Sequence, residues 1–436
     1  MDEAIVDGLP SAEPATSEPA IGEAYPKRRA IAEGPLVNMG WFNTGLALLV
    51  LEFPFKVLLK EQLHFSAEQV AGFLAVAMIP IYIKPFAGIL SDAVPLFGTR
   101  RRSYLLLGLI LAGIFYLMLS LVPRTYPALL ITYLGLSTFL TLTSTVLGGV
   151  MVEVGKRDRT TGKLSAQRLG ITNIVRVISG PLAGWLATQA IILTSVICSV
   201  LYFMLVPLYW IFLREKRDAR VNSEKLKEAT RQAKTLFTSG TLWAAAGLVV
   251  LVVASPGFDT ALLYHQTDNL HFSKPFIGQL DVIKGLFSMV GALIYGYACR
   301  HMPLRKLLTW SIIIHSTSTL FYLLYKTQAS AMVVTAIEST TLAIALLPLY
   351  DLAARATPRG SEALGYSVMM SVWNFTKNMS DLLGSAIYSR FGERMTELVW
   401  VNSITTALVL IAVPFLPSIL MDRKDGDADG HGLGSH

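Results

Sequence analysis

Charged residues are scarce in this chain of 436 residues. Asp, Glu, Lys and Arg make up only 15% of it, hydrophobic residues make up 53%, and the mean hydropathy is +0.52. A soluble domain carries about 25% charged residues. The composition therefore excludes an ordinary soluble protein and predicts an integral membrane protein whose main partner is the lipid bilayer.

Cysteine is also scarce, because only Cys198 and Cys299 occur and both lie within apolar runs. The sequence therefore predicts neither a disulfide framework nor a metal site. No Walker pattern precedes a helix, and no nucleophile–base spacing is present. We expect no enzyme activity and no cofactor, so that any uphill transport would be secondary.

The net charge of +7 comes from basic residues in short loops between apolar runs, and they form no patch on a polar domain. We therefore expect no nucleic-acid partner. With the N-terminus inside, the inner tails and loops hold 25 Lys and Arg residues, and the outer loops hold six. The positive-inside rule then predicts that both termini are cytoplasmic. The short loops favour a bacterial plasma membrane.

Twelve apolar runs approach the roughly 20 residues that a membrane-spanning helix needs. The expected spans are 38–58, 68–90, 103–122, 126–150, 167–188, 190–213, 240–264, 274–299, 304–325, 328–350, 362–388 and 396–420. The predicted fold is thus an all-α integral membrane protein with twelve transmembrane helices in two pseudo-symmetric six-helix bundles.

Composition also predicts the domain boundaries. Residues 1–37 form a disordered cytoplasmic tail rich in Ala, Glu, Pro and Ser. The N-terminal bundle spans 38–213, a charged cytoplasmic linker spans 214–239, and the C-terminal bundle spans 240–420. Residues 421–436 form a second cytoplasmic tail. We expect a monomer.

Two similar loops mark the halves. The loop GILSDAVPLFGTRRRSYL, residues 88–105, follows the second span, and GYACRHMPLRKLL, residues 296–308, follows the eighth. Each combines a glycine with a short basic turn. Two six-helix halves with matching basic loops are typical of the major facilitator superfamily, in which a midplane site is reached alternately from both sides.

The first loop resembles the form of this signature found in the folate–biopterin transporter family. The residues that carry the resemblance are Gly88, Leu90, Ser91, Asp92, Pro95, Phe97, Gly98, Arg100, Arg101, Arg102, Tyr104 and Leu105. The resemblance continues through 303–306 and 353–374 and covers about residues 40–390.

The resemblance implies a conformational latch formed by Gly88, Asp92, Arg100, Arg101, Arg102 and Glu153. Asp92 would meet the N-terminus of the eleventh helix, where a helix dipole favours a carboxylate. One of the three arginines would pair with Glu153 in the fourth helix. These contacts would hold the outward-open state.

The resemblance implies a secondary active transporter that works by alternating access. Folate-transporting members carry two aspartates in the fourth helix, where this chain has Ser144 and Gly148. A pterin-like or folate-like substrate is therefore one of several small organic solutes that the sequence allows. Bacteriochlorophyll-delivery proteins have a similar loop, so a pigment-delivery or assembly factor is the alternative function.

Charges at membrane depth are costly and call for a partner or a function. Three pairs have helical spacing: Glu52 with Lys56, Asp281 with Lys284, and Lys377 with Asp381. The basic residues suit an anionic substrate. The candidate substrate-binding and translocation residues are Glu52, Lys56, Lys84, Arg176, Lys284, Trp373, Asn374 and Lys377.

Protons are the expected coupling ion, and proton coupling needs a carboxylate at membrane depth. The candidates are Asp259, Glu338, Asp281 and Asp381. Arg176 and Glu338 lie near the middle of spans from different halves, so we expect a link between them that opens and closes with the rocking motion.

Overall fold

The computed structural model describes residues 27–157, 161–213, 215, 223–358 and 361–415. Nearly all of these residues are helical, and the β-structure among them is a single bridge between Leu96 and Thr99. The predicted all-α class is confirmed.

The N-terminal half contains nine helices among the described residues. They are α1 (Lys27–Leu63), α2 (Ala67–Ala77), α3 (Ile79–Tyr82), α4 (Lys84–Ala93), α5 (Arg101–Leu121), α6 (Tyr126–Arg157), α7 (Thr161–Leu186), α8 (Ile191–Phe203) and α9 (Leu205–Phe212).

A linker helix and the C-terminal half follow. Their elements are α10 (Ser223–Thr238), α11 (Gly240–Val253), α12 (Asp259–Tyr264), η1 (His265–Asn269), α13 (Lys274–His301), α14 (Leu304–Thr319), η2 (Leu320–Leu324), α15 (Gln328–Arg355), α16 (Glu362–Arg390), α17 (Met395–Leu408), η3 (Val409–Ile411) and η4 (Val413–Phe415).

Each predicted span overlaps one helix or consecutive helices among the described residues, which is consistent with twelve spans. Seven described helices are long and apolar enough to cross a membrane alone, and a further pair, 227–238 and 240–253, is bent by 69°. Proline explains several breaks, because it removes a backbone donor inside a helix. Pro80 and Pro85 stand at the starts of α3 and α4, and divide the second span into three helices.

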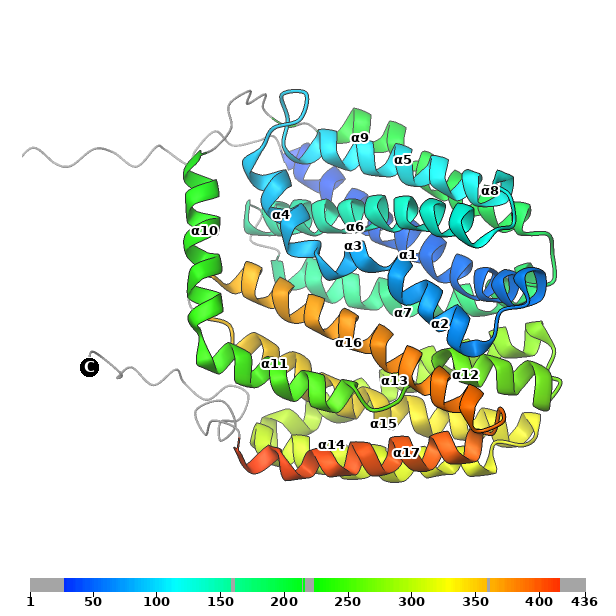
Figure 1. Ribbon diagram of the computed structural model, residues 1–436. Helices are drawn as coiled ribbons and strands as arrows, with labels where there is room; N and C mark the ends of the chain where they lie inside the picture. Colours follow the sequence, from blue (N-terminus) through cyan, green and yellow to red (C-terminus); the bar gives the residue numbers. More distant parts are fainter. Residues whose placement is uncertain (1–26, 158–160, 214, 216–222, 359–360, 416–436) are drawn as a thin grey trace, which may run out of the picture.

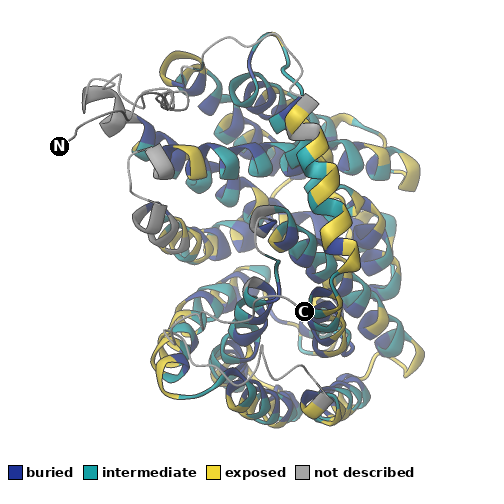
Figure 2. Cartoon of the chain, turned by 90° about the vertical axis from the view of Figure 1, so that its left-hand side faces the viewer, coloured by how far each residue is buried: buried dark blue, intermediate teal, exposed yellow. Residues whose placement is uncertain are grey.

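The observed boundaries differ from the expected ones at both the first tail and the linker. Helix α1 begins at Lys27, so residues 27–37 are helical instead of belonging to the tail. Part of the linker forms α10, which has an exposed stripe and crosses one end of the molecule (Figure 2). Residues 1–26, 214, 216–222 and 421–436, which carry the rest of these predictions, lie outside the described residues.

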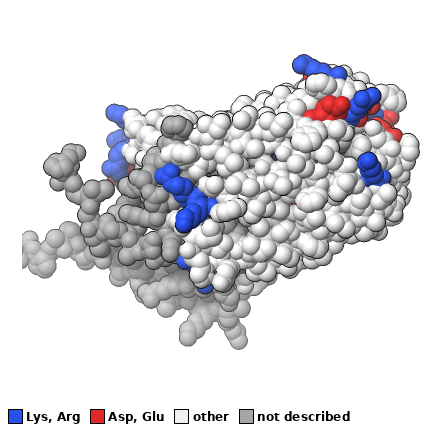
Figure 3. Space-filling model, turned by 90° about the horizontal axis from the view of Figure 1, so that it is seen from below, with Lys and Arg blue, Asp and Glu red and all other residues white. Residues whose placement is uncertain are grey.

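The long helices run roughly side by side, with the two halves one above the other in Figure 1. We call the end that carries α10 and residues 94–100 the linker end. The opposite end, with residues 64–66 and 265–273, is the far end. Between them, the face seen in Figure 3 is almost free of charged side chains, as expected for a surface in contact with lipid.

The apolar core is continuous between the halves only toward the far end. One cluster of buried residues joins the N-terminal half to α12, the start of α13 and the start of α17. A second cluster fills the C-terminal half toward the linker end, around Leu242, Leu308 and Trp373. The halves are therefore packed together more completely at the far end.

Candidate functional site

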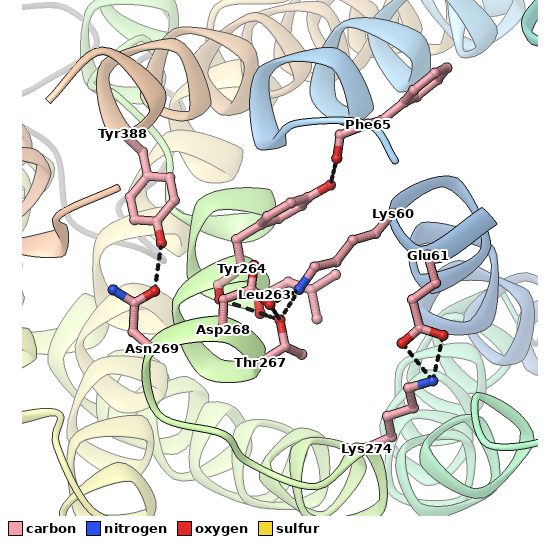
Figure 4. A network of polar contacts seen from close by, with 10 residues as sticks. All are labelled: Lys60, Glu61, Phe65, Leu263, Tyr264, Thr267, Asp268, Asn269, Lys274 and Tyr388. Atoms are coloured by element: carbon pink, nitrogen blue, oxygen red, sulfur yellow. Dashed lines mark hydrogen bonds and ion pairs between the residues drawn. The ribbon is translucent and has the colours of Figure 1, made fainter. Parts of the chain in front are cut away.

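Two ionic contacts join the halves at the far end (Figure 4). Lys60, near the end of α1, donates to Asp268 in η1. The adjacent Glu61 binds Lys274 at the start of α13, with its two carboxylate oxygens 2.8 and 2.9 Å from Nζ. Tyr264 also donates from the end of α12 to the carbonyl oxygen of Phe65. Together these contacts close the far end.

Glycines allow helices α7 and α13 to approach each other closely. A Cβ atom on Gly278 would lie 2.3 Å from the carbonyl oxygen of Gly180 and 2.8 Å from the Cα atom of Gly184. Gly180 and Gly184 have the spacing of a small-xxx-small motif, which brings membrane helices into backbone contact. Because α7 and α13 belong to different halves, this contact depends on the halves' relative position.

The role of the ion pair between Glu61 and Lys274 can be tested by exchanging the two charges. Glu61→Gln should raise the ratio of open to closed far ends by up to about fivefold, because an exposed ion pair contributes about 0.2–1 kcal/mol. The exchange Glu61→Lys with Lys274→Glu should restore closure. Distances between spin labels at Gln62 and Thr396, both exposed at the far end, would measure it. Glu68→Gln is the control, and failure of the exchange to restore closure would contradict the role of this pair.

Six of the predicted charges at membrane depth form three ion pairs in a cluster between the halves. Lys56 pairs with Glu52 on α1, with Nζ 3.1 Å from the carboxylate oxygen, and Lys284 pairs with Asp281 on α13 at 2.8 Å. Lys377 on α16 pairs with Asp259 of α12 at 3.3 Å. These groups also interact across the halves, since Glu52 is close enough to Lys377 to interact electrostatically.

The expected pair of Lys377 with Asp381 is absent from the structure. The carboxylate of Asp381 instead accepts hydrogen bonds from the backbone N–H and the hydroxyl of Thr260, at 2.8 and 2.6 Å. The cause is the break at residues 254–258, which brings the start of α12 against α16: the N–H of Gly257 donates to the carbonyl of Ser380. The side chains of Lys377 and Asp259 remain 58% and 54% exposed, so this pair is accessible in this conformation.

Three basic side chains of the N-terminal half form no ion pair with any described residue: Lys84 of α4, and Arg168 and Arg176 of α7. Lys84 and Arg168 are close enough to interact with each other, and Arg168 also approaches Tyr366 of α16. The guanidinium of Arg168 lies over the ring of Trp41, 4.0 Å from its centroid. We call Lys84, Arg168 and Arg176 the basic triad.

Arg168 is absent from the predicted site residues. It stands at the second position of the expected span 167–188, close to the end of that span. A second arginine in the same span as Arg176 was the signal that could have identified it.

Two predicted residues on α16 have different surroundings from those expected. Trp373 is buried in the core of the C-terminal half, with its ring centroid 4.9 Å from that of Tyr350. Asn374 is partly buried, and its backbone carbonyl accepts a hydrogen bond from the Asn378 amide. Trp373 therefore acts as a packing residue in this conformation.

The expected link between Arg176 and Glu338 is wrong for this conformation. Glu338 is buried and points toward α14 of its own half, where His315 Nδ1 lies 3.5 Å from the carboxylate. Arg176 instead lies beside α13, where its Cγ and Cδ atoms would be 3.3 Å from a Cβ atom on Gly285. Arg176 and Glu338 therefore lie beside different helices, α13 and α14, in this conformation.

At the linker end, Arg101 joins the predicted latch residues. One Nη atom lies 2.6 Å from Asp92, and Nε lies 3.8 Å from Glu153. Gly88 packs near α6, where a Cβ atom would lie 3.6 Å from Thr145 Cγ2. Asp92 therefore contacts its own half instead of the expected N-terminus of α16.

The other two arginines are held by the end of the N-terminal half. Arg102 stacks on Trp210, 4.7 Å from the ring centroid, and donates to its carbonyl oxygen at 2.6 Å. The carboxylate of Glu215 accepts the backbone N–H groups of Arg100, Arg101 and Arg102 at 3.0, 2.9 and 2.9 Å. This carboxylate occupies the N-terminus of α5, which a helix dipole favours. No sequence motif indicated the role of Glu215.

The described residues contain no group of three or more His, Cys, Asp or Glu side chains that could hold a metal ion. The chemistry available between the halves is therefore that of ion pairs, free basic groups and aromatic rings.

Comparison with known proteins identifies the chain. The model of the BT1 family matches residues 44–433. The chain is 27% identical to the Folate-biopterin transporter of Synechocystis sp., over 85% of this chain and 78% of that protein. It is 23% identical to Folate transporter 1 of Plasmodium falciparum, over 76% of this chain and 68% of that protein.

Solved transporter structures share the fold. A D-xylose-proton symporter aligns with 89% of this chain and 98% of its own, at a TM-score of 0.67 and 12% identity. A POT family transporter in complex with 5-aminolevulinic acid aligns with 88% of this chain and 96% of its own, at a TM-score of 0.70 and 11% identity.

The fold and the relatives agree with the prediction of a multi-pass membrane transporter that is not an enzyme. The expected resemblance to the folate–biopterin transporters is also confirmed. The chain belongs to the BT1 family, whose model covers most of its length.

Proposed function

We propose that this transporter moves a small organic anion by alternating access and couples that movement to protons. The observation that carries the proposal is the basic triad. These three basic groups have no carboxylate partner among the described residues, whereas the lysines of the cluster between the halves are all paired. A bound carboxylate or phosphate would supply the missing partner.

The surroundings of the triad favour an anion that also carries a planar ring. Trp41 already stacks with one guanidinium, and Tyr366 is near the same group. Folates combine a pterin ring with carboxylates, and the relatives from Synechocystis and Plasmodium are named for folate. Folates and pterins are therefore the first compounds to test. The triad also favours a carrier over the alternative of pigment delivery, since a pigment is mostly apolar.

The far-end contacts support alternating access. They include two ion pairs, and the pair of Glu61 with Lys274 is partly exposed, so it is weak enough to break and re-form. With the linker end at the cytoplasm, as the distribution of basic residues predicts, this conformation would face inward. In an outward-facing conformation the far-end contacts would break, and Asp92 would be free to meet α16.

A thermal-shift screen tests the proposed substrate class. The purified protein should be stabilised by some of a panel of pterins, folates and simpler organic anions, because a ligand that binds only the folded state raises Tm. Neutral sugars of similar size serve as the control. Stabilisation by the neutral compounds alone would contradict an anionic substrate.

A further inference from the structure

Glu338 lies in an enclosed polar site within the C-terminal half. Its side chain is only 9% exposed. Ser318 Oγ donates to the carboxylate at 3.1 Å and lies 2.7 Å from Thr341 Oγ1. His315 approaches from α14, and its buried Nδ1 makes no hydrogen bond to a described residue. An unused ring nitrogen therefore faces a buried carboxylate.

Glu338 differs in its surroundings from the other acidic candidates for proton coupling. Asp259 and Asp281 each pair with a lysine, and Asp381 is held by two donors of Thr260. The titratable groups that face Glu338 from the described elements are His315 and Tyr322, and no lysine or arginine is among them. A carboxylate and an imidazole together can hold one proton at zero net charge.

Tyr322 connects this site to the cluster between the halves. Its buried ring is close enough to interact with both Glu338 and Asp259. The ring centroid lies 5.0 Å from that of Phe258, at the break before α12. Asp259 pairs with Lys377, which interacts with Glu52 of the N-terminal half. A change of charge at Glu338 would therefore act on groups that contact the other half.

We propose that the Glu338–His315 pair binds the coupling proton at a site separate from the substrate site. The inference rests on the proposed proton-coupled transport. The loaded pair holds one proton, on the carboxyl group of Glu338, and has no net charge. The unloaded pair has released that proton to water and carries one negative charge. One proton is then taken up and released in each transport cycle.

Infrared difference spectroscopy of the purified protein tests the pair without any substrate. Besides the bands of exposed carboxyl groups, the difference spectra between acidic and neutral pH should contain a separate C=O band from protonated Glu338. The band should vanish in Glu338→Gln and shift in frequency or pH midpoint in His315→Asn, while Glu228→Gln at the linker end keeps it. A wild-type spectrum without the band, or its survival in Glu338→Gln, would overturn the proposal. If Glu338→Gln does not fold, a band unmoved in His315→Asn would do so.

Transport in proteoliposomes separates this inference from the proposed function, with radiolabelled folic acid as the probe. Glu338→Gln should keep exchange of labelled for unlabelled folic acid but lose accumulation driven by a pH gradient. If wild-type protein accumulates folic acid regardless of the gradient, proton coupling itself is wrong. If wild-type accumulation needs the gradient and Glu338→Gln still responds to it, only the proton site is wrong.

Discussion

Gly278→Leu should abolish transport while the protein still reaches the membrane. A Cβ atom there would lie 2.3 Å from the Gly180 carbonyl oxygen. This is a backbone atom within a helix, so it cannot rotate away as the end of a side chain can. Helices α7 and α13 would have to separate, at a cost of about 1–3 kcal/mol or more. The ratio of closed to open far ends would fall by about fivefold to more than a hundredfold.

Spin labels at Gln62 and Thr396 would measure this shift as a longer distance in the variant. Gly247→Leu on α11 is the matched control, because no described atom lies within 4 Å of a Cβ at that position. Both variants add the same side chain to a glycine in a membrane helix. Normal transport and an unchanged label distance in Gly278→Leu would show that the glycine contact is not needed for closure.

Arg168→Gln and Arg176→Gln should each weaken binding of an anionic ligand by roughly 10- to 150-fold. A hydrogen bond to a charged group is worth about 1.5–3 kcal/mol, and both guanidinium groups lack an ionic partner among the described residues. Arg168→Lys should give a smaller loss, because lysine keeps the charge but not the two-pronged geometry. Calorimetric titration with the best anion from the thermal-shift screen measures the change.

The control for the triad is Arg394→Gln, an exposed position just before α17 at the far end. It removes the same charge at the opposite end of the molecule from Arg168. Binding should remain within experimental error of the wild type. Equal affinities for the wild type and both triad variants would move the substrate site away from α7.

Helical spacing in the sequence correctly predicted two ion pairs whose partners lie on the same helix. Ion pairs at three- or four-residue spacing were expected for Glu52 with Lys56 and for Asp281 with Lys284, and the structure contains both. The third expected pair failed because the break before α12 supplies a closer partner for Lys377. A pairing between distant helices depends on their packing, which helical spacing alone does not determine.

The same limit applies to the far end and to Glu215. The contact of Gly278 with Gly180 needs two helices about a hundred residues apart in the sequence. The cap by Glu215 on α5 joins positions 113 to 115 residues apart. The family signature, by contrast, is contiguous, which is why the loop at residues 88–105 could carry the resemblance to the folate–biopterin transporters.

Uptake of radiolabelled folic acid and related pteridine anions into proteoliposomes tests the central claim most directly. With an imposed pH gradient, the wild-type protein should accumulate at least one of these anions against its concentration gradient. A protonophore and Arg176→Gln should each abolish the accumulation. Uptake no greater than that of protein-free liposomes, for every anion tried, would contradict the account.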